Sequence, residues 1–189
     1  MYKRQIVKFF SIIQEYCPYL KDYHLLISSS NSFPHSSGIA SSASSMSALS
    51  LCIMSLEKKL TLIDDDYFFK KASFISRIGS GSASRSVYGG VNFWGKHKEL
   101  NNSSDLYSVK LSKNISPKFN NYRDVILIID DKEKEVSSSV GHGLMNDNPF
   151  SKVRFNAANN NITKLLQILA SGNLNDVCEC LYVFLNIKN

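Results

Sequence analysis

The chain has 189 residues, of which 43% are hydrophobic and 20% are charged, and its formal net charge is +6. This length fits one domain, or one domain with part of another, and the composition is that of a globular protein with a real core. No apolar run approaches the length of a membrane span, and the basic residues are scattered pairs without interleaved aromatic residues. We therefore expect no membrane partner and no nucleic-acid partner.

The four cysteines do not form a recognisable metal or disulfide pattern. Cys17 and Cys52 are isolated, and Cys178 and Cys180 are too close together for the usual zinc spacings. The N-terminus carries no apolar signal segment with a small-residue cleavage site. We therefore expect reduced thiols and a cytoplasmic location.

The first part of the chain predicts two helices, with a short strand and a loop between them. Residues 5–16 carry apolar side chains at helical spacing, and Pro18 ends this predicted helix. The apolar run at residues 24–28 predicts a short buried strand. It leads into a loop at residues 34–44, which feeds a largely apolar helix reaching about Leu60.

The loop at residues 34–44 combines small and hydroxyl-bearing residues just before a helix N-terminus. Unpaired backbone N–H groups and the helix dipole favour a phosphate at that position, and small side chains let the phosphate come close. Serine is also a common capping residue, so an ordinary helix cap is the alternative interpretation. The residues of this loop alone leave both interpretations open.

A second helix and a second loop follow. The acidic cluster at residues 64–66 favours helix capping over metal binding, and the next helix is predicted near residues 67–78. The loop at residues 79–86 is again rich in glycine and serine. Residues 87–94 predict a strand whose two adjacent glycines indicate a bulge or a close approach.

Two further strands and a third hydroxyl run come next. Residues 106–111 predict one strand, and residues 124–130 form the clearest buried strand pattern in the chain. The hydroxyl run lies at residues 136–142, and the pattern turns helical after Pro149 and again at residues 178–185. Because strands and helices alternate without regular βαβ spacing, the sequence predicts an α+β fold and not a doubly wound sheet.

Three ordered motifs resemble those of one enzyme family. The run starting at Pro34 fits P-x3-G-[LI]-x-S-S-A, which is similar to the phosphate-binding loop of GHMP small-molecule kinases. GSGSASRS at residues 79–86, followed by Tyr-Gly-Gly, and K-x-V-S-S starting at Lys134 are similar to runs in diphosphomevalonate decarboxylases. Taken together, the motifs resemble the diphosphomevalonate decarboxylase family within the GHMP superfamily.

This resemblance implies an activity and a domain organisation. The family decarboxylates mevalonate 5-diphosphate to isopentenyl diphosphate with ATP and Mg²⁺, a step of isoprenoid biosynthesis. The implied fold is the α+β GHMP N-terminal domain, which resembles some ribosomal protein domains. Residues 1–148 would be a partial N-terminal domain, and residues 149–189 would begin a C-terminal helical region. The resemblance also allows a homodimer.

The resemblance further implies roles for individual residues. Arg85 would position a substrate anion, because guanidinium offers a fixed fork to carboxylate or phosphate. Ser80, Ser82 and Ser138 would also contact the substrate, and Ser42 is the candidate Mg²⁺ ligand. The residues that would hold the ATP phosphates are Pro34, Ser36, Ser37, Gly38, Ala40, Ser41, Ser42 and Ser44.

The chain also departs from the family pattern. Ser84 stands where the family usually has cysteine, and neither an early K-Y-W-G-K-like run nor the D-A-G-P-N-like run with the catalytic aspartate occurs. We therefore expect a fragment that is inactive alone, since a lost general base costs about 10²–10⁴-fold in rate. The alternatives are a related mevalonate or phosphomevalonate kinase, which GSGSASRS disfavours, and a non-catalytic nucleotide-binding remnant.

Overall fold

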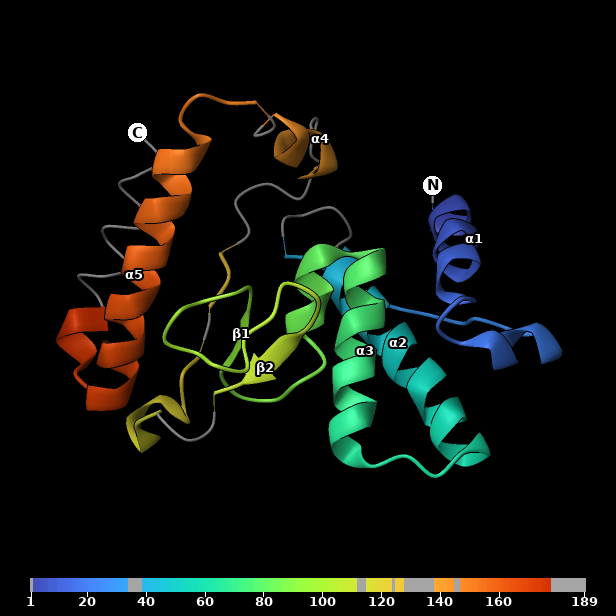
Figure 1. The fold of residues 1–189 in the computed structure, drawn as a ribbon. Helices are drawn as coiled ribbons and strands as arrows, with labels where there is room; N and C mark the ends of the chain where they lie inside the picture. Colours follow the sequence, from blue (N-terminus) through green and yellow to red (C-terminus); the bar gives the residue numbers. More distant parts are fainter. Residues whose placement is uncertain are drawn as a thin grey trace. The chain divides into compact units, whose positions relative to one another are not determined.

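The computed structural model of this chain divides into two compact units. The first contains the elements up to Lys110, and the second contains those from Leu111 onward (Figure 1). The residues that the structure describes are 2–33, 39–111, 115–123, 125–127, 138–144 and 147–177.

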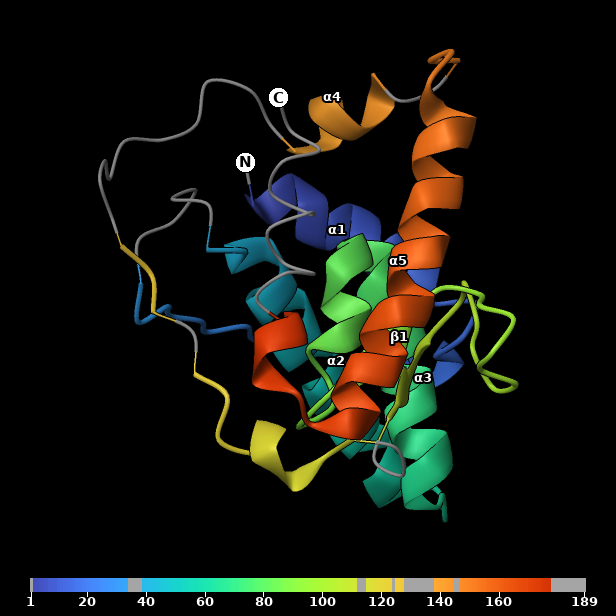
Figure 2. The same cartoon turned by 90° about the vertical axis from the view of Figure 1, so that its left-hand side faces the viewer.

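The first unit is built on a pair of antiparallel helices. α2 spans Ser41–Leu60 and α3 spans Asp65–Gly79, and the two lie side by side in both views (Figure 1 and Figure 2). The Asp64 carboxylate caps α3 by accepting a hydrogen bond from the Tyr67 N–H at 2.7 Å. The predicted helices and the capping interpretation of the acidic cluster are therefore confirmed.

A third helix and a short 3₁₀ helix run along this pair. α1 spans Tyr2–Ile13 and η1 spans Pro18–Asp22, as the first helical pattern and its terminating proline predict. Apolar side chains from these elements and from α2 and α3 form one buried core. The largest apolar members with almost no exposure are Phe9, Ile13, Cys17, Met54 and Ile75.

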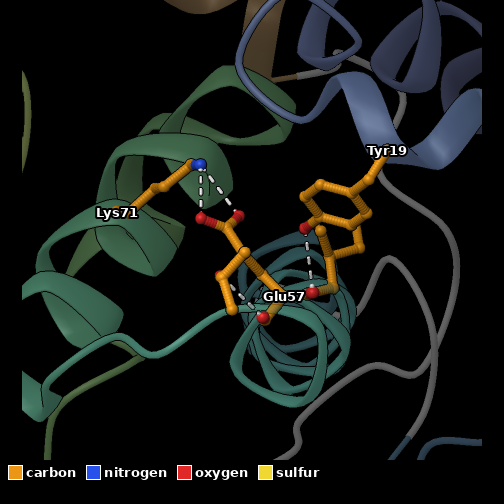
Figure 3. A network of polar contacts seen from close by, with 5 residues as sticks. Tyr19, Glu57 and Lys71 are labelled. Atoms are coloured by element: carbon orange, nitrogen blue, oxygen red, sulfur yellow. Dashed lines mark hydrogen bonds and ion pairs between the residues drawn. The ribbon is translucent and has the colours of Figure 1, made fainter.

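A buried ion pair joins α2 to α3 at the end of α2 where the chain turns back (Figure 3). Both carboxylate oxygens of Glu57 lie 2.8 Å from Lys71 Nζ, and the two side chains are only 8% and 16% exposed. Burial alone lowers the pKa of Lys71, but hydrogen bonds to Glu57 and Tyr67 outweigh it and raise the pKa, so the amine stays charged. The Tyr19 hydroxyl donates to the Ile53 carbonyl at 3.1 Å and ties η1 to the same region.

A small sheet completes the first unit. β1 (Asn92–Trp94) pairs antiparallel with β2 (Ser108–Lys110), with Phe93 opposite Val109. The strand predicted at residues 106–111 is confirmed in part, whereas only the end of the stretch 87–94 is a strand. Gly90 has φ +77°, a left-handed conformation that glycine adopts readily, and it lies in the turn and bends of residues 86–91 that precede β1.

Two strand predictions are wrong. Residues 24–28 belong to no helix or strand and are exposed, with Leu26 98% exposed. Residues 125–127 are likewise outside any strand, and Val125 and Leu127 are 80% and 83% exposed. An apolar run becomes a buried strand only when other strands flank it, and the one sheet among the described residues consists of β1 and β2 alone. The rest of the stretch 124–130 lies outside the described residues.

The second unit contains η4 (Pro117–Phe119), α4 (Ser138–Gly143) and α5 (Ser151–Ser171). α5 confirms the helical pattern after Pro149, and residues 178–185 lie outside the described residues. Within this unit the Ser116 N–H donates to the Leu169 carbonyl at 2.8 Å. The boundary predicted between residues 148 and 149 stays a prediction. No helix in the described part of the chain has the length and apolar character of a membrane span.

The first glycine of the second Gly/Ser loop is explained by packing. A Cβ at Gly79 would lie 2.5 Å from Met46 Sδ and 3.1 Å from Phe9 Cδ2. Overpacking costs about 1–3 kcal/mol, which exceeds the roughly 0.5–1 kcal/mol by which alanine favours a helix over glycine. We therefore expect Gly79→Ala to lower the free energy of unfolding by about 1 kcal/mol in urea titrations. The matched control is Gly89→Ala, where a Cβ meets nothing within 4 Å; equal losses in both variants would contradict this packing role.

Candidate functional site

The start of α2 and the second Gly/Ser loop lie together in the first unit. That loop forms the 3₁₀ helix η2 (Gly81–Arg85) directly after α3. Ser42 Oγ, in the first turn of α2, lies 3.2 Å from Ser80 Oγ, although 38 positions separate the two residues in sequence. The return of α3 along α2 therefore brings together two motifs that are distant in the chain.

A pocket of about 460 Å³ opens beside this contact. Small-molecule sites typically occupy about 300–1,000 Å³, so its size suits a small ligand. Three segments form its wall, namely the start of α2, η2 with the residue after it, and the chain that enters β1. The lining residues are Ala40, Ala43, Ser82, Arg85, Ser86, Gly90, Val91 and Asn92.

The first turn of α2 has no side-chain cap. Ala40 occupies the N-cap position with φ +68° and ψ +45°, a left-handed conformation that is unusual for alanine. Its carbonyl accepts hydrogen bonds from the backbone N–H groups of Ala43 and Ser44 at 3.0 and 3.2 Å. The ordinary serine cap, which the sequence left open, is therefore not formed at this helix. Ala40, whose side chain is a single methyl group, also lines the pocket.

The serines of this first turn have different surroundings. Ser41 is buried, and Ser44 Oγ donates back to the Ser41 carbonyl at 2.9 Å. Ser42 is exposed, with its hydroxyl beside Ser80. The remaining predicted phosphate-binding residues, Pro34, Ser36, Ser37 and Gly38, lie outside the described residues.

Arg85 and Ser82 line the same pocket. Arg85 is exposed at the end of η2, and within the described residues it makes no ion pair. A guanidinium with no acidic partner among the described residues can bind an anion. Ser138 begins α4 in the second unit, and its side chain is not among those described. The binding roles of all these residues stay predictions.

A network of buried serines holds η2 in place, and the sequence patterns did not indicate it. The Ser84 carbonyl accepts hydrogen bonds from Ser73 Oγ at 2.7 Å and from Ser108 Oγ at 2.5 Å. The Ser108 N–H donates to Ser73 Oγ at 2.8 Å, and all three residues are fully buried. Ser84 Oγ also donates to the Gly81 carbonyl at 2.9 Å. The backbone carbonyl of Ser84 therefore joins η2 to α3 and β2, and the Ser84 hydroxyl is hydrogen-bonded within η2.

Tyr88, the aromatic residue of the Tyr-Gly-Gly run, serves packing. Its ring centroid lies 5.6 Å from that of Phe69. Burial, with smaller contributions from Asp66 and Tyr107, raises the pKa of Tyr88 to about 12, so the phenol stays protonated near neutral pH.

Comparisons with known proteins show which proteins this chain is similar to. Residues 1–106 match the model of the diphosphomevalonate decarboxylase-like N-terminal domain. The chain is 36% identical to the diphosphomevalonate decarboxylase of Ganoderma lucidum over 126 residues, and 33% identical to that of Saccharomyces cerevisiae over 124 residues. Each alignment covers 66% of this chain and 29% of the relative.

A solved structure of the same family is also similar to this chain. The crystal structure of a mevalonate diphosphate decarboxylase from Legionella pneumophila matches with a TM-score of 0.70 and 29% identity, over 96% of this chain and 53% of that one. The chain thus spans about half of that structure and under a third of the curated relatives. The α+β prediction is confirmed, and because the family model covers more than half of its residues, this chain belongs to the diphosphomevalonate decarboxylase family.

Proposed function

We propose that this chain supplies the part of a diphosphomevalonate decarboxylase active site that binds the phosphates of ATP and the anionic groups of mevalonate 5-diphosphate. The observation that carries the proposal is the convergence of two motifs, with Ser42 and Ser80 in contact beside the pocket that Arg85 lines. The relatives are diphosphomevalonate decarboxylases, which supports the choice of substrate. The relatives are much longer than this chain, so the activity of the whole protein is part of the proposal.

The start of α2 fits a nucleotide phosphate. A 20-residue helix begins there without a side-chain cap, and the neighbouring side chains are small. Its partial positive charge and the exposed Ser42 hydroxyl would face a phosphate. ATP, when bound, supplies the phosphoryl group that turns the tertiary hydroxyl of the substrate into a leaving group.

Mg²⁺ would come with the nucleotide. Among the described residues there is no group of three or more His, Cys, Asp or Glu side chains that could hold a metal ion. Mg²⁺ is commonly held by one or two protein ligands together with water and substrate phosphates, and Ser42 is the candidate for such a ligand.

The substrate anion would be bound by the residues of the second Gly/Ser loop, namely Ser80, Ser82 and Arg85. Phosphoryl transfer depends mainly on positioning and charge neutralisation, which a guanidinium and nearby hydroxyls can provide. The buried serines around Ser84 would keep Arg85 at a constant position relative to α3 and β2. The proposal also includes a cytoplasmic location, in keeping with the free thiols of Cys17 and Cys52.

Binding and turnover can be measured separately. We expect calorimetry to show that the purified 189-residue chain binds both Mg·ATP and mevalonate 5-diphosphate. We expect no release of CO₂ above background, because the D-A-G-P-N-like run with the general base does not occur in this sequence. Binding of neither ligand would contradict the proposed function. A phosphorylated product that accumulates without CO₂ would favour the related kinases instead.

A further inference from the structure

The glycine between Ser80 and Ser82 lies against the indole ring of Trp94. A Cβ at Gly81 would lie 3.2 Å from Cη2 and 3.7 Å from Cζ3 of this ring. Carbon atoms in contact are optimally about 3.5–4.0 Å apart, so the first of these distances is too short. The φ of Gly81 is not positive, and the backbone alone therefore does not require glycine there. Glycine is needed because the ring of Trp94 occupies the space of a side chain.

The ring of Trp94 is itself held in place. Its Nε1–H donates to the Asp105 carbonyl at 2.9 Å, and the carboxylate of the same aspartate accepts a hydrogen bond from the Lys96 N–H at 2.9 Å. The backbone of Trp94 belongs to β1, where it is paired with Ser108 of β2. An aromatic side chain with a hydrogen-bonded N–H on a paired strand has few alternative positions. Trp94 is therefore a rigid surface against which Gly81 packs.

The two opposing residues of the sheet, Trp94 and Ser108, both contact η2. Trp94 packs at Gly81, the first residue of η2, and the Ser108 hydroxyl donates to the Ser84 carbonyl near its end. The chain between these two contacts carries Ser82, which lines the pocket. One pair of residues in the sheet thus holds both ends of a segment in the pocket wall.

We infer that Trp94 is a positioning residue, which acts through Gly81 to hold Ser80 and Ser82 where they can bind the substrate anion. This inference rests on the proposed function and deepens it, because it names the side chain that fixes the hydroxyl groups of the second Gly/Ser loop. Trp94 is not among the residues that line the pocket, so it does not touch the ligand. Its effect on binding is large because hydrogen bonds weaken steeply when their geometry is disturbed.

Gly81→Ala tests this role, since the added methyl group must displace either the ring or the loop. By calorimetry on the full chain we expect the affinity for mevalonate 5-diphosphate to fall about tenfold, the effect of losing one hydrogen bond to a charged group. The affinity for Mg·ATP, which is assigned to the start of α2, should change by less than about twofold. Gly89→Ala is the matched control, because a Cβ there meets nothing within 4 Å, and both affinities should stay within about twofold.

Combining Gly81→Ala with Trp94→Phe separates positioning from a general loss of stability. Phenylalanine lacks the part of the indole ring that carries Cη2 and Cζ3, so it makes room for the added methyl group. We expect the double variant to bind mevalonate 5-diphosphate within about threefold of the unmodified protein, although each substitution alone weakens binding. Such a recovery is expected of two residues in contact, and it would not follow from two independent losses of stability.

Trp94→Phe alone keeps the inference testable if Gly81→Ala does not fold, and it too should weaken mevalonate 5-diphosphate and not Mg·ATP. Trp94 is the only tryptophan of the chain, so a shifted emission maximum in Gly81→Ala, and not in Gly89→Ala, would report the disturbed contact. Equal weakening of both ligands, or of neither, would overturn the role of Trp94 and leave the proposed function intact. Binding of neither ligand by the unmodified protein would overturn the proposed function, and the role of Trp94 with it.

Discussion

Replacement of Arg85 by glutamine is expected to weaken the binding of mevalonate 5-diphosphate by about 10–100-fold. The reason is that a hydrogen bond to a charged group contributes about 1.5–3 kcal/mol, and each 1.4 kcal/mol is a factor of ten in affinity. Arg85 lines the pocket and makes no ion pair with a described residue, so its removal leaves no acidic partner exposed. Calorimetry at fixed ionic strength measures the change directly.

The control for Arg85→Gln removes the same charge elsewhere. Lys98 is exposed in the segment between β1 and β2 and does not line the pocket. Lys98→Gln should change the affinity by less than about twofold, because charges that remain in water interact weakly over distance. A loss of equal size in both variants would show that net charge, and not the position of Arg85, governs binding.

Replacement of Glu57 by glutamine is expected to lower the free energy of unfolding by about 3–5 kcal/mol, measured by urea titration. The variant leaves the buried Lys71 ammonium without its carboxylate, and an uncompensated buried charge is costly. A further variant, Glu57→Leu combined with Lys71→Met, removes both charges and should recover much of this loss.

The matched control is the exposed pair on the same helices. Lys58 Nζ lies 2.6 Å from Asp65 Oδ1, but the side chains are 48% and 76% exposed. Lys58→Gln should cost less than about 1 kcal/mol, since exposed ion pairs contribute little. Losses of similar size in Glu57→Gln and Lys58→Gln would contradict the importance of burial.

The buried pair also predicts a dependence on pH. The pKa of Lys71 is raised above its ordinary value of 10.5, so the folded state holds this proton more tightly than the unfolded state does. The resulting stability is fully present below pH 10.5 and is lost as the pH rises through the folded pKa.

Glu57 lies about 24 Å along α2 from Ser41, so Glu57→Gln should leave ligand affinity unchanged.

The helices of this chain could be predicted because their signals are local. Apolar spacing, Pro18 and the Asp64 cap all act within a few residues of the helices they define. The two wrong strand predictions have the opposite cause, because the burial of a strand is not a local property. Leu26 and Val125 lie in sequences suited to a buried strand, but burial depends on neighbouring strands that a local pattern cannot specify.

The candidate site likewise contains some residues that the sequence indicates and others that only the fold reveals. The motifs that contain Ser42 and Arg85 are visible as residues and spacing, and they suffice to indicate the family. The partners of Ser84 are not visible, because Ser73 and Ser108 are ordinary serines until folding buries them together.

By itself, then, the sequence determined the family, through the loop at residues 34–44 and its two companion motifs, and from these motifs it predicted the binding residues. The choice between a capping loop and a phosphate site depended on more. The tertiary structure excludes a serine side-chain cap at the start of α2, where Ala40 occupies the N-cap and Ser42 meets Ser80, and phosphate binding there stays a prediction. The physical reason is that helix dipoles, small side chains and hydroxyls are local properties. A binding pocket exists only when packing brings distant segments to the same place.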